Sequence, residues 1–155
     1  MKRIVKIIGI VLITIFIIIQ IIPRDHNENA AIPVNDITKI YTVPVNVGAI
    51  LKKSCYDCHS DHTAYPWYAQ LQPFRFMLDR HIREGKAELN FSEFGTYSSR
   101  KQRSKLRAIG ESLEEGSMPL SSYTLIHRNA ILTKEDKALL MNWAKITTDS
   151  LIQKN

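Results

Sequence analysis

The two cysteines of this 155-residue chain lie three residues apart, in the segment Cys55-Tyr56-Asp57-Cys58-His59. Residues three and four apart share one face of a helical turn, so both thiols and the following imidazole can point toward one partner. Cys-x-x-Cys-His is the form of a covalent c-type haem attachment site. In such a site Cys55 and Cys58 form thioethers with the haem vinyl groups, and His59 is the proximal iron ligand. The segment therefore predicts one covalently bound haem c per chain.

Three other uses of two cysteines at this spacing have less support. A structural zinc site would take Cys55, Cys58 and a histidine such as His59 or His62, but such sites usually show a second ligand pair, and the chain has no further cysteine. A thioredoxin-like dithiol requires a βαβ context, and no strand pattern surrounds the motif. A disulfide between residues three apart would close a very small loop and add little stability. A zinc or dithiol module remains the non-haem alternative.

The iron of a c-type site takes a second protein ligand or keeps an open sixth position. Met118 is the preferred distal ligand, because it lies in a loop directly after an expected helix end and is followed by Pro119, which fixes the next backbone segment. The other internal methionines fall within expected helices, where methionine more often fills a core. His127 and His81 are the alternative distal ligands.

Residues 1–24 form a segment of their own. Lys2, Arg3 and Lys6 precede an almost unbroken apolar run over residues 7–22, which is the pattern of an export signal. No small-x-small cleavage site follows the run, and its length is close to the ~20 residues that cross a bilayer. We expect an uncleaved transmembrane signal anchor with its basic end in the cytoplasm. The alternative is a cleaved signal peptide and a soluble periplasmic protein.

The distribution of charge argues against a nucleic-acid-binding protein. Four of the 21 basic side chains and none of the 15 acidic ones lie in residues 1–24, so the remainder of the chain is close to neutral. Most of the basic character therefore belongs to targeting. In the oxidising compartment that export implies, two free thiols tend to form a disulfide, whereas thioethers to haem would occupy both.

The rest of the chain divides into a tether over residues 25–45, rich in Asn, Pro and charge, and a domain over residues 46–155. In the domain, apolar residues recur at helical spacing, and no segment alternates apolar and polar residues for long enough to predict a strand. We expect four helices: from Asn46 to the motif, from Gln72 to between Gly85 and Leu89, from Ser98 to Glu115, and from Thr133 onward.

These helices predict an all-α fold: a cytochrome c-like bundle of about four short helices around a covalent haem, behind the N-terminal transmembrane helix. Haem is a large apolar disc, so a small domain can use it as part of its core. A group of aromatic residues is expected near the macrocycle: Tyr65, Trp67, Tyr68, Phe74 and Phe76.

Several segments resemble the bacterial haem-binding domain family of small single-haem cytochrome c-like proteins. They are CYDCHS at 55–60, TAYPWY at 63–68, LNFSE at 89–93 and GSMPL at 116–120. The resemblance covers about residues 47–143. It implies a haem-binding domain behind a membrane anchor, in a family that is sometimes attached to cytochrome c peroxidases. Single-haem cytochromes c commonly bind iron through such a Met-Pro loop, which supports Met118.

Together these features predict a membrane-anchored monohaem c-type cytochrome on the periplasmic side of the bacterial cytoplasmic membrane. We expect a monomer that is not an enzyme and that passes single electrons between periplasmic or membrane redox proteins. A haem peroxidase or gas sensor with an open sixth position is the alternative. The basic residues of the 98–115 helix form either a docking patch for an acidic partner or a solvated face: Arg100, Lys101, Arg103, Lys105 and Arg107.

Overall fold

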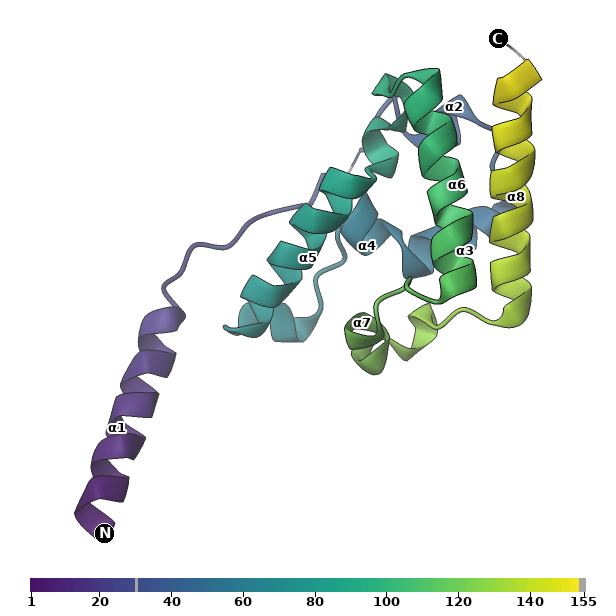
Figure 1. The fold of residues 1–155 in the computed structure, drawn as a ribbon. Coiled ribbons are helices and arrows are strands. Elements are labelled where there is room, and N and C mark those ends of the chain that lie inside the picture. The colour runs from purple at the N-terminus through teal and green to yellow at the C-terminus, as the bar shows by residue number, and fades with distance from the viewer. Residues whose placement is uncertain (30, 154–155) are drawn as a thin grey trace.

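The computed structural model describes residues 1–29 and 31–153, and this part of the chain is helical (Figure 1). The all-α prediction is confirmed, because the described residues contain no strand and only one isolated bridge, between Glu28 and His62. The longer helices are α1 (Lys2–Ile19), α3 (Val45–Ser54), α5 (Phe74–Glu88), α6 (Ser99–Glu115) and α8 (Lys134–Gln153). The short ones are α2 (Ile37–Ile40), α4 (Tyr56–His59), α7 (Ser121–Ile126) and the 3₁₀ turns η1 (Trp67–Gln70), η2 (Phe91–Thr96) and η3 (Arg128–Ala130).

The main core lies where α6 and α8 pack side by side, running in opposite directions, with α3 packed against α8 (Figure 1). Leu106 and Leu113, two turns apart on α6, are both buried, as is Leu140 on α8. Trp143 of α8 donates a hydrogen bond from its indole nitrogen to the Thr42 carbonyl oxygen, 3.2 Å away. This bond ties α8 to the segment that leads into α3.

The helix predicted over residues 98–115 is confirmed at both ends. The Ser98 hydroxyl accepts the backbone N–H of Lys101, and Gly116 ends the helix in the left-handed conformation, at φ 71°. The helix predicted from Thr133 begins at Lys134, and Thr133 and Asp136 exchange the hydrogen bonds of a capping box.

The other two predicted helices start close to their expected positions. α3 begins one residue earlier than Asn46 and ends at Ser54, because Cys55 leaves the helical conformation at φ −127°. α5 begins at Phe74, two residues later than predicted, because Gln72 acts from outside the helix: its side-chain oxygen accepts the backbone N–H of Phe76 at 3.0 Å.

The segment predicted as a tether also contributes to the core. Within residues 25–45, α2 forms with the Asp36 side chain accepting the backbone N–H of Thr38 at 2.9 Å. Ile37 is completely buried in the main core. A four-residue helix is too short to show a periodic pattern, so the sequence gives no sign of it.

The apolar N-terminal segment forms α1, which extends away from the rest of the chain (Figure 1). The helix ends at Ile19, includes Lys2, Arg3 and Lys6, and has no buried residue. Within residues 1–29 and 31–153, no helix has the length and apolar character that crossing a membrane requires. The prediction of a transmembrane helix is therefore not confirmed.

Candidate functional site

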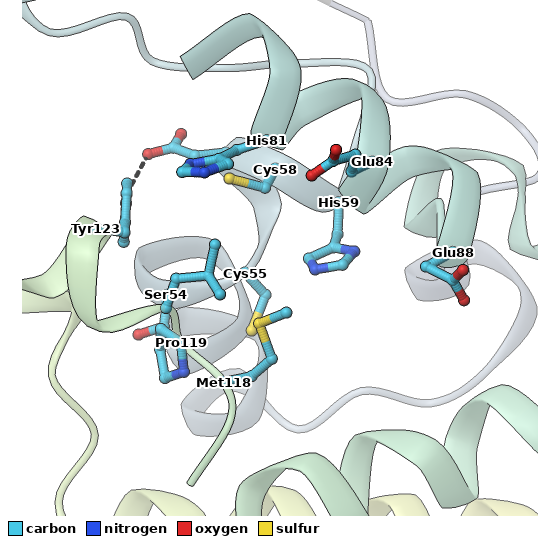
Figure 2. A pocket seen from close by; sticks show the side chains of 13 residues that line it. Ser54, Cys55, Cys58, His59, His81, Glu84, Glu88, Met118, Pro119 and Tyr123 are labelled. Carbon is cyan, nitrogen blue, oxygen red and sulfur yellow. Dashed lines mark hydrogen bonds between the residues drawn. The ribbon is translucent and has the colours of Figure 1, made fainter. Parts of the chain in front are cut away.

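The Cys-x-x-Cys-His segment folds as a single helical turn between α3 and α5. The backbone N–H groups of Cys58 and His59 both donate to the Cys55 carbonyl oxygen, at 3.2 and 3.0 Å. This turn brings both cysteines and His59 to the wall of one hollow (Figure 2). The two thiols are free, so they are not joined as a disulfide.

A backbone carbonyl fixes the orientation of His59. The Nδ1 atom lies 2.9 Å from the Leu89 carbonyl oxygen. Because a carbonyl oxygen only accepts, Nδ1 carries the proton and Nε2 keeps its lone pair for a ligand. Burial lowers the pKa of His59, although hydrogen bonds to the carbonyls of Leu89 and Gly85 oppose this shift. The imidazole is therefore held in the neutral form that binds metals.

The environment of the thiols keeps them protonated. Burial raises the pKa of Cys55 to about 12 and that of Cys58 to about 11, with a smaller contribution from neighbouring negative charge. Redox-active dithiols show the opposite shift, because their chemistry needs a thiolate at neutral pH. In the described part of the chain, no three His, Cys, Asp or Glu side chains are grouped as metal ligands. The raised pKa values of the two thiols count against the dithiol alternative.

Helix α5 packs directly on the motif turn through Gly85. A Cβ atom at this position would lie 2.6 Å from the Cys58 carbonyl oxygen, which is closer than real Cβ atoms come to any neighbour. The helix ends at Glu88, within the range from Gly85 to Leu89 that the sequence predicts. Gly85 therefore permits a close approach of helix and motif, and it does not terminate the helix.

Two adjoining hollows meet at the motif turn. Their volumes are about 710 and 760 Å³ when the open space at the mouth of each hollow is included. Both are lined by Cys55, His59, Glu88 and Met118. The second hollow has mainly apolar walls from the end of α5 and from η2, α6 and α8: Leu89, Phe91, Ala108, Ile109, Leu113 and Leu140. A flat apolar cofactor with a metal centre fits these walls, the free Nε2 of His59 and the two thiols.

The structure brings Met118 to the same hollows, although it lies far from the motif in the sequence. Gly116 ends α6, and the next residues turn back so that Met118 and Pro119 line the first hollow. Figure 2 shows Met118 on the wall of the hollow that Cys55 and His59 also line. Met118 keeps 37% of its surface exposed, so its sulfur is not locked into a core.

The two alternative histidines are placed differently. His81, on α5, lines the first hollow near Cys58. His127 lines neither hollow: its Nε2 lies 2.7 Å from the Tyr68 hydroxyl, and its ring stacks on Tyr123 with centroids 4.2 Å apart. None of the five aromatic residues predicted near the macrocycle lines either hollow, whereas Phe91 and Tyr123 do.

Asp57 connects the motif to two other segments, a role that sequence reasoning missed. Its carboxylate accepts the Tyr123 hydroxyl at 2.6 Å and the backbone N–H of Ala64 at 3.0 Å. The first bond joins the motif turn to α7, directly after the Met118 loop. The position of Asp57 between the two cysteines does not predict the bond to Tyr123, because Tyr123 is distant in the sequence.

Charged side chains lie at the mouths of the hollows. Glu84 and Glu88 of α5 line the first hollow, and Lys105 of α6 lines the second. The Lys105 ammonium lies 3.2 Å from the Glu88 carboxylate, which is largely exposed. One member of the predicted basic patch on α6 is thus part of the site.

A family model described as a haem-binding domain matches residues 14–146 of the chain. The match includes the motif turn, α5, α6 and the Met118 loop. No curated protein and no solved structure matches the chain.

Proposed function

The chain belongs to the haem-binding domain family, and we propose that it is a monohaem c-type cytochrome that carries single electrons. One observation carries the proposal: the two thiols, the free Nε2 of His59 and the Met118 thioether border the same apolar space. A thioether and an imidazole on one space suit an iron held by two protein ligands, which is the arrangement of an electron carrier.

Each of these side chains has a distinct part in the proposal. Cys55 and Cys58 would hold the haem through two thioethers, and His59 and Met118 would be its proximal and distal iron ligands. When bound, the haem supplies a one-electron iron couple. Methionine as the second ligand raises the reduction potential relative to a second histidine. The Leu89 carbonyl fixes the ring of His59, and the apolar walls from α6 and α8 would shield a bound haem from water.

We further propose that the chain is exported and stays attached to the bacterial cytoplasmic membrane through α1, with the haem domain on the periplasmic side. Three basic residues precede the apolar part of this helix, and none of its side chains is buried by the domain. An exposed apolar helix of this kind is stabilised by contact with lipid. Its partners would be periplasmic or membrane redox proteins, and no enzymatic activity is part of the proposal.

The test uses the full chain produced in a bacterial strain that attaches haem c. We expect haem to stay with the polypeptide after denaturation and acid–acetone extraction, and a spectroelectrochemical titration to give one reversible one-electron wave. A colourless protein would refute the proposal. Haem that is extracted would leave haem binding intact but contradict covalent attachment. A spectrum altered by peroxide or carbon monoxide would favour the peroxidase or gas-sensor alternative.

Replacing Met118 by alanine is expected to remove the far-red methionine–iron absorption band completely and to lower the reduction potential. The physical reason is that the thioether of Met118 is the soft ligand on the wall of the hollow that His59 also lines. The measurement is the visible spectrum of the ferric protein, followed by a redox titration of the same sample.

The matched control is Met77→Ala, because Met77 is exposed on α5 and lines neither hollow of the site. This variant should keep the band and the potential. If the band survives in Met118→Ala, or if it is absent from the unaltered protein, the distal ligand lies elsewhere. The variants His81→Ala and His127→Ala then test the two alternatives.

A further inference from the structure

A continuous apolar surface covers one end of the domain. Trp67 is 79% exposed, and Tyr68 links it to Phe74, with ring centroids 6.0 and 6.3 Å apart. A shallow hollow then joins Tyr68 and Phe74 to Ile126 of α7. We call this surface the η1–α7 face, and it consists of six exposed apolar residues: Trp67, Leu71, Phe74, Met77, Leu125 and Ile126.

The two sequence segments that form the η1–α7 face contain no acidic residue. Residues 62–78 and 116–134 contain no aspartate or glutamate, although the chain has 15 acidic residues in total. Arg128, next to α7, is exposed and basic. An apolar surface with exposed tryptophan and phenylalanine, with a basic residue nearby and no acidic residue in the two segments that form it, has the character of a segment that lies in a membrane interface.

The end of α1 is fixed to this same end of the domain. The Gln20 side chain exchanges two hydrogen bonds with the backbone of Gln72, at 3.0 and 3.3 Å. The Arg24 guanidinium donates to the side-chain and backbone oxygens of Gln70, at 2.8 and 2.7 Å. Gln70 and Gln72 lie between Trp67 and Phe74 in the sequence, so the chain leaves α1 at the border of the η1–α7 face.

The positions of the helices also place α1 on the side of the η1–α7 face. In Figure 1, the beginning of α5 and the whole of α7 lie at the lower end of the domain, on the side where α1 lies. The beginning of α6 lies at the opposite end. A membrane that holds α1 would therefore lie on the side of the domain that carries the η1–α7 face.

We propose that the η1–α7 face rests in the headgroup region of the membrane to which α1 attaches, so that the domain lies on the lipid in one orientation. This inference rests on the membrane attachment proposed above. The occupant of the face is the lipid surface itself. His81 and Tyr123 line both the hollow under this face and the hollow beside His59, so the proposed haem site lies directly behind the lipid-facing side.

The test places a nitroxide on the holoprotein through Trp67→Cys, with Ser99→Cys as the matched control. Ser99 is exposed at the first position of α6, at the far end of the domain. Thioethers occupy both natural cysteines, so each variant offers one thiol, and the unaltered chain should take no label. The proteins are bound to phosphatidylcholine–phosphatidylglycerol vesicles in the ferrous state, and collision rates with oxygen and with a water-soluble nickel chelate are measured.

On vesicle binding we expect the label at position 67 to become several-fold less accessible to nickel and more accessible to oxygen. The label at position 99 should stay accessible to nickel. Full nickel access at position 67 in vesicle-bound protein would overturn the inference and leave membrane attachment intact. Failure of the protein to sediment with vesicles would refute both. Protection at position 67 without lipid would instead indicate a protein contact and also overturn the inference; Phe74→Cys repeats the test at a second site.

Discussion

The chain in which Cys55 and Cys58 are both replaced by serine is expected to lose all of its haem on denaturation. These are the only two cysteines in the sequence, and both border the hollow that His59 enters. A serine hydroxyl has nearly the same size as the thiol but forms no thioether with a vinyl group. The measurement is haem staining of the polypeptide after denaturing electrophoresis, with acid–acetone extraction in parallel.

The control is His62→Ala, which removes a nearby imidazole that lines neither hollow of the site. It should retain as much covalent haem as the unaltered chain. Each single cysteine variant should keep one thioether and hence some stain. Undiminished stain in the double variant would mean that the haem is attached through another residue, and the assignment of Cys55 and Cys58 would be wrong.

The variant Gly85→Ala is expected to lower the free energy of unfolding by about 1–3 kcal/mol, the usual cost of overpacking. The added Cβ would lie 2.6 Å from the Cys58 carbonyl oxygen, and this oxygen belongs to the backbone of the motif turn. Either α5 or the motif must therefore shift. Because Cys58 and His59 lie in the same motif turn, the shift should alter the haem spectrum as well.

The matched control is Gly110→Ala on α6, where a Cβ would meet nothing within 4 Å. Alanine is favoured over glycine in a helix by about 1 kcal/mol, so this variant should be as stable as the unaltered chain or more stable. Urea unfolding of both variants gives the comparison. If Gly85→Ala matched Gly110→Ala in stability and spectrum, the close approach of α5 to the motif would be refuted.

The sequence predicts those parts of the fold whose signals are local. Ser98 and Gly116 mark the two ends of α6 because a cap and a left-handed stop act within one helical turn. By contrast, Ile37 and Phe94 are completely buried in segments too short for a helical period. Their burial depends on contacts with distant parts of the chain, which no local pattern records.

In the site, too, the sequence predicts the local features and misses the contacts between distant residues. The motif turn and the position of Met118 after a helix end can be predicted from short segments. The bond from His59 to the Leu89 carbonyl spans 30 residues, and the bond from Tyr123 to Asp57 spans 66, so neither has a sequence signal. The aromatic residues of η1 and early α5 lie away from the site because α5 turns Leu78 and Ile82 inward and leaves Phe74 exposed.

Helix α7 is held to the rest of the domain without any buried residue of its own, so it can open more easily than the core. None of its residues is buried, and its ties to the motif turn and η1 are the Tyr123–Asp57 bond and the contacts of the adjacent His127. The α6–α8 pair, in contrast, holds the main core. Segments with few buried contacts open locally at a low free-energy cost. We therefore expect α7 and the adjacent Met118 loop to open together in a minor population while the α6–α8 core stays folded, and in that population Met118 would not reach the hollow beside His59.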